Sequence, residues 1–467
     1  MVTKPAGLIG LDEALHMSST RNVELNERFC NPRLTRMLKM IQADRPAVRA
    51  EGSFYWDRDG NRYLDFLAGF GSMSLGANHP RIQRAMAELD GLPPILQNLN
   101  HLAGALAHNL ALLAPGDLKR VFFANSGTEV VEAAIKLSRA ATRRKRIVAC
   151  KGCFHGRTTG ALALIANPLF REAFEPLLPD VSHVPYDDPE ALEAALRKRD
   201  VAGFIVEPIQ SEGGINVPSP GYLKTAGEIC SRYGTLLVVD EVQTGLGRTG
   251  RMFAIERENV TPDVLLLGKA LGGGAMPISA ALCTQAVFQA GKSATPRTAF
   301  QTPTFGSNSR ACGVALAALE ILVDERLPER AEESGAYLMS RLQELKRRHA
   351  LIADVRGKGL LIGIELASPA RGVAAALTAS ALNRAARELM LGMVIMRMYT
   401  HHNVMTAFTL NRPDVLRLEP ALNATREQMD MAVDAIDQTL TSLKGYAYGA
   451  FSSWRALRAR HKTAAAG

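Results

Sequence analysis

The chain has 467 residues, of which 47% are hydrophobic and 22% charged, a composition typical of a globular protein with two or three structural units. The formal net charge is +9, but the basic residues are interleaved with 46 acids except at 143–146 and 455–462, and neither run is flanked by stacking aromatics, so nucleic acid is not an expected partner. Six scattered cysteines exclude a disulfide framework, no apolar run approaches about 18 residues, and Asp12 and Glu13 stand where a signal peptide would be apolar, so we expect a cytoplasmic protein that does not bind membranes.

Residues 1–94 are predicted to form an N-terminal arm and a β-hairpin that contribute to a smaller domain. The arm has helical pieces with a break at Asn31-Pro32. Two β-rich runs, 53–57 and 62–66, flank an Asp-Gly-Asn turn, which is a hairpin signal.

Residues 95–345 alternate short apolar runs with longer amphipathic ones. Near-continuous apolar strands separated by helices indicate an α/β fold, in which a mainly parallel sheet is covered by helices on both faces. The predicted strands are 121–124, 146–150, 204–206, 236–239, 264–267 and 278–282, and the predicted helices include 129–142, 190–199 and 222–233.

A further predicted helix at 311–322 leads out of this large domain. Residues 346–445, with a strand at 360–366, are expected to form a smaller α+β domain, and residues 446–467 a frayed basic, Ala-rich tail.

Ligands of open α/β sheets bind outside the carboxyl ends of the strands, so the polar residues that follow the apolar runs are candidates for a site. After 121–124 come Ser126, Gly127, Thr128 and Glu129, which open a helix. They fit a capping box, and they also offer a glycine, hydroxyls and free backbone N–H groups that could cradle a phosphate. Capping alone is the alternative.

The loop after 146–150 carries Phe154 and His155 next to glycines. The aromatic ring could stack on a flat ligand. Cys150 and Cys153 form one CxxC in the same region, but no second ligand pair stands at zinc-site spacing, so no metal is expected.

Carboxylates follow the next two strands. Glu207 and Glu212 come after 204–206, and they could serve acid-base chemistry, cover a cation, or only pair with nearby arginines. Asp240 follows four buried residues, so it needs a cationic or protonated partner to stay ionised.

Lys269 follows the apolar run 264–267 and is set among glycines. Desolvation lowers the pKa of a lysine towards that of a nucleophile that forms Schiff bases, although a solvated lysine in a turn is the plainer interpretation of this pattern. A phosphate cradle, a stacking aromatic, an acid for a ring nitrogen and such a lysine together match pyridoxal 5′-phosphate (PLP).

Seven motifs, in chain order, carry a resemblance to a known family. They are FANSGTEVVEAAIKLSR at 123–139, FHGRT at 154–158, VEPIQSEGG at 206–214, VDEVQTGLGRTG at 239–250, KALGGG at 269–274, TFGSN at 304–308 and LRLEP at 416–420. Over most of residues 50–440 the chain resembles the class III PLP-dependent aminotransferases of fold type I. The nearest branches act on putrescine, acetylornithine or ornithine.

The resemblance implies roles for residues at the cofactor. Lys269 forms the Schiff base and then acts as the base in the proton shift, Asp240 pairs with the pyridinium nitrogen, Phe154 and Val242 sandwich the ring, and Gln243 approaches its phenolic oxygen. The resemblance further places Ser126, Gly127 and Thr128 at the phosphate with Thr304 of the neighbouring subunit of a homodimer, His155 beside the cofactor, and Glu207 behind it.

The resemblance also implies substrate contacts. Arg417 takes a carboxylate of the glutamate/2-oxoglutarate pair, and Glu212 covers Arg417 when an ω-amine is bound. Arg157 matches an arginine that binds the α-carboxylate in the ornithine and acetylornithine branch. Phe70 stands where the ornithine branch has tyrosine, so the two signals conflict over the donor.

Other departures from the family pattern are Gln301 for a frequent histidine, Ser309 for a proline, and Ala421 for a proline. The expected function is an ω-aminotransferase that moves a terminal amino group to 2-oxoglutarate or pyruvate by a ping-pong scheme. A semialdehyde aminomutase or a decarboxylating transaminase is the alternative.

Overall fold

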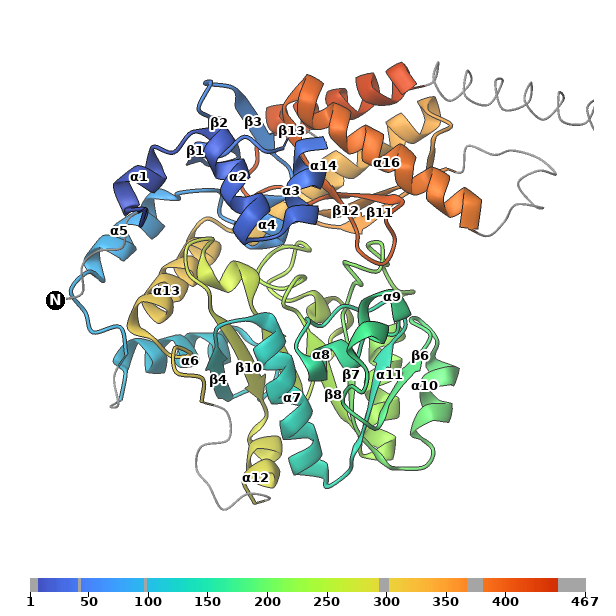
Figure 1. The fold of residues 1–467 in the computed structure, drawn as a ribbon. Coiled ribbons are helices and arrows are strands. Elements are labelled where there is room, and N and C mark those ends of the chain that lie inside the picture. Colours follow the sequence, from blue (N-terminus) through green and yellow to red (C-terminus); the bar gives the residue numbers. More distant parts are fainter. Residues whose placement is uncertain (1–6, 41–42, 96–98, 294–301, 368–380, 444–467) are drawn as a thin grey trace, which may run out of the picture.

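The computed structural model describes residues 7–40, 43–95, 99–293, 302–367 and 381–443. Three sheets organise these residues: a seven-stranded sheet and two four-stranded sheets (Figure 1). The predicted tail at 446–467 and Gln301 lie outside the described residues.

The seven-stranded sheet has the order β4-β10-β9-β8-β7-β5-β6. Its pairs are parallel from β9 to β6, and only β10 runs antiparallel, to both β9 and β4. The strands are β4 Arg120–Ala124, β5 Arg146–Cys150, β6 Val181–Val184, β7 Val201–Val206, β8 Leu236–Asp240, β9 Val264–Leu267 and β10 Ser279–Cys283.

Both faces of this sheet are buried, because successive side chains of each strand enter different cores. In β9, Val264 and Leu266 belong to the core that α7 (Gly127–Thr142) covers. Leu265 and Leu267 belong to the core that α11 (Tyr222–Tyr233) covers. This explains why the strand reads as a continuous apolar run.

The two smaller sheets join distant parts of the chain. The sheet β1-β2-β3-β13 pairs the N-terminal hairpin with β13, which is parallel to β3. The sheet β11-β12-β15-β14 is antiparallel. The strands are β1 Ala47–Glu51, β2 Phe54–Asp57, β3 Arg62–Asp65, β11 Ile352–Lys358, β12 Leu361–Leu366, β13 Val404–Met405, β14 Ala407–Phe408 and β15 Val415–Leu418.

Helices fill the connections between the strands. The others are α1 Leu11–Leu15, α2 Ser19–Phe29, α3 Pro32–Met40, α4 Ala68–Gly71, α5 Pro80–Glu88, α6 His101–Leu113, α8 Thr159–Ala163, α9 Pro168–Arg171, α10 Pro189–Leu196, α12 Gln285–Ser293, α13 Ser309–Asp324, α14 Leu327–Arg348 and α16 Ala381–His402, followed by a helix over 426–443. Among the helices of the described ranges, none has the length and apolar character needed to cross a membrane.

The predicted α/β fold class and the mainly parallel sheet are confirmed. The sequence prediction missed β6, whose VSHV sequence mixes polar and apolar residues. The domain bounds at 94, 345 and 445 stay a prediction.

Candidate active site

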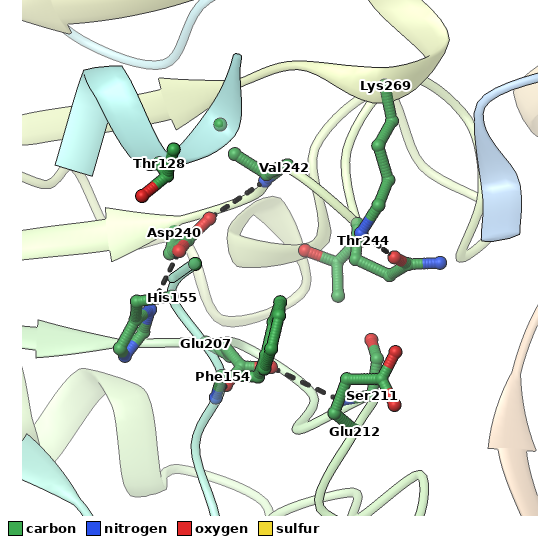
Figure 2. Close-up of a pocket in the computed structure, with 13 residues that line it drawn as sticks. Thr128, Phe154, His155, Glu207, Ser211, Glu212, Asp240, Val242, Thr244 and Lys269 are labelled. Atoms are coloured by element: carbon green, nitrogen blue, oxygen red, sulfur yellow. Dashed lines mark hydrogen bonds and ion pairs between the residues drawn. The ribbon is translucent and has the colours of Figure 1, made fainter. Parts of the chain in front are cut away.

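A cavity of about 190 Å³ opens beside the carboxyl ends of β7, β8 and β9 (Figure 2). This is the edge at which parallel sheets bind ligands. The lining residues are Gly127, Thr128, Phe154, His155, Gly156, Glu207, Ser211, Glu212, Asp240, Val242, Gln243, Thr244 and Lys269. Within the described part of the chain, no group of His, Cys, Asp or Glu side chains is arranged to hold a metal ion.

Asp240 is the last residue of β8 and is buried, with a fractional exposure of 5%. Its Oδ2 lies 2.7 Å from Nδ1 of His155, and its Oδ1 accepts the N–H of Val242 at 3.0 Å. Burial opposes a charged imidazole, but the neighbouring Cys153 and Asp240 outweigh burial and raise the pKa of His155 well above its usual value. A protonated His155 supplies the cation that a buried Asp240 carboxylate requires.

Lys269 begins a single 3₁₀ turn directly after β9 and has φ = +42°. A non-glycine residue in this left-handed region is strained, and such strain clusters at functional sites. Burial lowers the pKa of Lys269, and the carboxylates of Glu419 and Glu212 oppose the shift without cancelling it. Its Nζ donates to Oε1 of Gln243 across the cavity.

The amino end of α7 faces the cavity through Gly127 and Thr128. The Thr158 hydroxyl donates to the Glu132 carboxylate at 2.6 Å, so the proton shared by the Thr128 and Thr158 hydroxyls, 2.7 Å apart, comes from Thr128. The Thr128 hydroxyl therefore already donates its proton to the Thr158 hydroxyl. The donors that remain for an anion at this helix end are backbone N–H groups.

Ser126 caps the same helix but is not among the residues that line the cavity. Its hydroxyl donates to Oε2 of Glu129 at 3.1 Å, and its N–H donates to the same oxygen at 2.9 Å. The predicted capping box is present, and it uses the Ser126 hydroxyl.

Phe154 and Val242 lie on opposite sides of the space that Asp240 and Lys269 border (Figure 2). Oε1 of Glu207 accepts the Phe154 N–H at 2.8 Å, which fixes the loop that carries the ring. Burial raises the pKa of Glu207 to about 7.

Arg417 is fully buried on β15, between two carboxylates. Its Nη2 lies 2.5 Å from Oε2 of Glu212, and its Nη1 donates to Oε2 of Glu419 at 3.3 Å. Arg417 and Glu212 therefore form one ion pair, of which Glu212 lines the cavity.

Phe70 belongs to a turn in which four consecutive residues, 68–71, have φ between +45° and +77°. A left-handed turn is unfavourable for Ala68 and Phe70, which have side chains. The turn places the Phe70 ring 5.7 Å from the guanidinium carbon of Arg417, while the Phe70 carbonyl accepts the Nε2 of Gln243 at 3.1 Å.

Five predicted site residues are not among those that line the cavity: Phe70, Ser126, Arg157, Thr304 and Arg417. Arg157 is exposed, 6.0 Å from the Phe154 ring and 5.6 Å from the Phe170 ring. Thr304 is exposed, and it does not line the cavity.

The sequence reasoning missed Glu419, whose Oε1 accepts Nε2 of Gln243 while its other oxygen holds Arg417. An acid two residues after Arg417, just beyond the end of β15, was the available signal, since alternate side chains of extended backbone project to the same face. Ser211, Thr244 and Gly156 also line the cavity and were not predicted.

Comparisons with known proteins agree on one family. The aminotransferase class-III family profile matches residues 39–440. The chain is 39% identical over 442 residues to the aminotransferase PigE of a Serratia species; the match covers 87% of this chain and 52% of PigE. The chain therefore spans about half the length of this curated relative.

Two solved structures are similar over nearly the whole chain. An ornithine aminotransferase of Toxoplasma gondii, in which PLP partially occupies the active site, has a TM-score of 0.80 and 31% identity, covering 94% of this chain and 98% of its own. An acetylornithine aminotransferase of Elizabethkingia anophelis has a TM-score of 0.73 and 33% identity, covering 91% and 100%. The chain belongs to the class III aminotransferase family.

Proposed function

We propose that this protein is a PLP-dependent ω-aminotransferase. It moves the terminal amino group of an amine or diamino acid, such as a putrescine-, acetylornithine- or ornithine-like donor, to a 2-oxo acid by a two-step, ping-pong scheme. Family membership and the PLP-containing ornithine aminotransferase structure support the chemistry. The Glu212–Arg417 pair at the cavity is the observation that carries the ω-specific part.

The residues at the cavity fit PLP. The buried Asp240 carboxylate suits a protonated pyridine nitrogen, and the amino end of α7 suits the phosphate. Phe154 and Val242 offer two apolar faces for a flat ring. When bound, PLP supplies an electron sink that stabilises negative charge on the substrate carbon.

Lys269 has two tasks in this proposal. Its Nζ would hold the cofactor, and the same atom would remove and return a proton at the reacting carbon of the substrate. The lowered pKa of Lys269 suits both tasks, because each requires the unprotonated amine. His155 orients the Asp240 carboxylate through the 2.7 Å contact.

Arg417 and Glu212 let one site accept two different substrates, the amine donor and the 2-oxo acid acceptor. A terminal amine donor has no carboxylate on the carbon that carries the reacting amino group, so Glu212 stays paired with Arg417 and neutralises it. A dicarboxylic 2-oxo acid brings its own carboxylate, which displaces that of Glu212 and forms a charge-assisted pair with Arg417. Phe70, stacked near the guanidinium, and Arg157, beside the Phe154 ring, complete the substrate side.

We propose a homodimer in which the partner subunit's Thr304 reaches the phosphate. The exposure of Thr304 and its absence from the cavity of its own chain support this arrangement. We also propose the domain division of the sequence prediction, with the hairpin of 1–94 joined to the C-terminal part through the β3–β13 pairing.

A panel of amines tested against 2-oxoglutarate and pyruvate checks the function. We expect aldehyde and the new amino acid in equal amounts, and no reaction without an acceptor beyond one turnover. Release of carbon dioxide would point to a decarboxylating transaminase, and an isomerised substrate to an aminomutase. Failure of every amine to react with the cofactor-bound protein would refute the proposal.

A further inference from the structure

One oxygen of Glu212 contacts two groups from different parts of the fold, one through an ion pair and one through a hydrogen bond. Oε2 lies 2.5 Å from Nη2 of Arg417 and accepts the backbone N–H of Leu410 at 2.9 Å. Arg417 lies on β15, whereas Leu410 lies in the turn between β14 and β15. The Glu212 carboxylate thus occupies a small subsite formed by one charged donor, the Arg417 guanidinium, and one neutral donor, the Leu410 N–H.

The turn that carries Leu410 is held independently of the Glu212 side chain. Asn411 donates its backbone N–H to the carbonyl of Glu212 at 2.9 Å, and its Nδ2 donates to the carbonyls of Gly152 and Cys153 at 3.1 and 3.2 Å. Its Oδ1 accepts Nδ2 of Asn167 at 3.1 Å. Leu410 N–H therefore keeps its direction when the Glu212 side chain turns away.

Arg417 is held in the same way. The fully buried Glu419 accepts its Nη1, so loss of the Glu212 contact leaves Arg417 with a fixed counter-ion on the other side. Both donors then point at the position that the departing carboxylate oxygen occupied. A donor left without an acceptor in a half-buried site is unfavourable, which favours a second carboxylate there.

We propose that the backbone N–H of Leu410 is a second donor of the substrate-carboxylate subsite, beside Arg417, and that Asn411 is the residue that positions it. The inference rests on the proposed function, in which a substrate carboxylate replaces that of Glu212. The ligand class is a dicarboxylate whose carboxylate next to the reacting carbon replaces that of Glu212 at these two donors.

The test must remove the competing internal carboxylate. In the wild-type protein, the Leu410 N–H donates to Glu212 in the free state and to the ligand in the bound state. Loss of this N–H destabilises the free and the bound state to a similar extent, so the measured dissociation constant hardly changes. With Glu212→Ala only the ligand-bound state uses this donor. The effect of Leu410 therefore emerges in the Glu212→Ala background.

The experiment measures dissociation constants of glutarate, a non-reacting dicarboxylate, for the PLP-loaded protein by calorimetry. Leu410→Pro removes the N–H, and Leu410→Ala in the same Glu212→Ala background retains it and serves as the matched control. We expect glutarate to bind about tenfold more weakly to the proline variant than to the alanine variant, the size of one charge-assisted hydrogen bond. Glutaramide, the neutral diamide, has no carboxylate for this subsite and should bind both variants alike.

Equal glutarate affinity in the proline and alanine variants would overturn the proposal, as would undetectable glutarate binding to the Glu212→Ala parent. If Leu410→Pro does not fold, as judged by thermal unfolding, Asn411→Ala in the same background replaces it. That variant keeps the Leu410 N–H but removes the hydrogen bonds of the Asn411 side chain that hold the turn, and we expect about threefold weaker glutarate binding with glutaramide binding unchanged. Unchanged glutarate binding in Asn411→Ala would overturn the positioning role. Because glutarate binding needs no turnover, a wild-type protein that binds glutarate but transaminates nothing would refute the proposed function and not this subsite.

Discussion

At the scale of single residues, the site depends on two charged groups whose surroundings change their chemistry. Asp240 is a buried carboxylate with His155 as its partner, and Lys269 is an amine in a strained turn among glycines. Neither property follows from the residue type alone. Both follow from placement at the carboxyl ends of neighbouring strands, where side chains leave the core and meet a ligand.

The lowered pKa of Lys269 predicts the pH dependence of cofactor attachment. Burial favours the neutral amine, so apo-protein should capture PLP with a midpoint below 10.5, the usual pKa of lysine. The amine is protonated and unreactive below its pKa, hence the rate rises with pH and levels off above the midpoint. Stopped-flow absorbance from pH 6 to about 11 measures this. A midpoint at or above that of free lysine would contradict the account.

Asp240→Asn should separate cofactor binding from turnover. An amide cannot hold a pyridine nitrogen protonated, so we expect kcat to fall by about a hundredfold or more, while the α7 end still binds the phosphate. Steady-state kinetics and a cofactor titration measure the two effects. A kcat within threefold of wild type would remove Asp240 from the proposed role.

The sequence predicted Lys269, Asp240 and the Glu212–Arg417 pair because each follows a recognisable strand or motif. It did not predict Glu419, whose contact with Gln243 joins the residue after β15 to the loop after β8, 176 positions apart. The role of the Leu410 N–H could not be predicted from the sequence either, because almost every residue type has the same backbone donor. Sequence motifs therefore do not predict contacts that are made by backbone groups or that join different sheets.

At the scale of elements, the amino end of α7 has little room for added volume. A Cβ on Gly127 would lie 2.9 Å from Cγ1 of Val242, one of the two apolar faces of the cavity. The strands were predictable because both faces are buried and their runs are apolar. In contrast, β6 and the left-handed turn at 68–71 have no such pattern, because tertiary contacts impose them.

Gly127→Ala should therefore weaken PLP binding about tenfold by displacing Val242. Gly104→Ala is the matched control, since a Cβ there meets no atom within 4 Å in α6. We expect the control to stabilise the protein by up to about 1 kcal/mol, with unchanged PLP affinity. Cofactor titration and urea unfolding give both numbers. Equal PLP affinity in the two variants would show that the helix end tolerates a side chain.

At the scale of the whole molecule, the site combines parts of three sheets. Asp240 ends β8 and Lys269 follows β9 of the seven-stranded sheet, Arg417 lies on β15 with Glu419 just after it, and the segment after β3 supplies Phe70. The N-terminal hairpin and the C-terminal part are tied through β3 and β13, which are more than 300 residues apart in the chain. Substrate recognition thus depends on how these parts meet.

The proposed dimer predicts an effect of an exposed residue. Thr304→Ala should weaken PLP binding about tenfold, by loss of one hydrogen bond to the phosphate of the neighbouring subunit. Thr302→Ala, also exposed in this chain, is the control and should bind PLP as wild type does. Cofactor titration, with light scattering for the oligomeric state, measures this. Identical PLP affinity in the two variants, or a monomer in solution, would contradict the shared site.

The central claim, an amino-group transfer in two separable steps, is tested most directly by single-turnover spectroscopy of the PLP-loaded protein. Addition of a terminal amine without an acceptor should bleach the visible absorbance of the lysine-bound cofactor and release one aldehyde per site. Addition of 2-oxoglutarate should then restore the absorbance, and Lys269→Ala should show neither change at a comparable rate. Absorbance that no amine alters, or aldehyde that forms only when donor and acceptor are present together, would contradict the account.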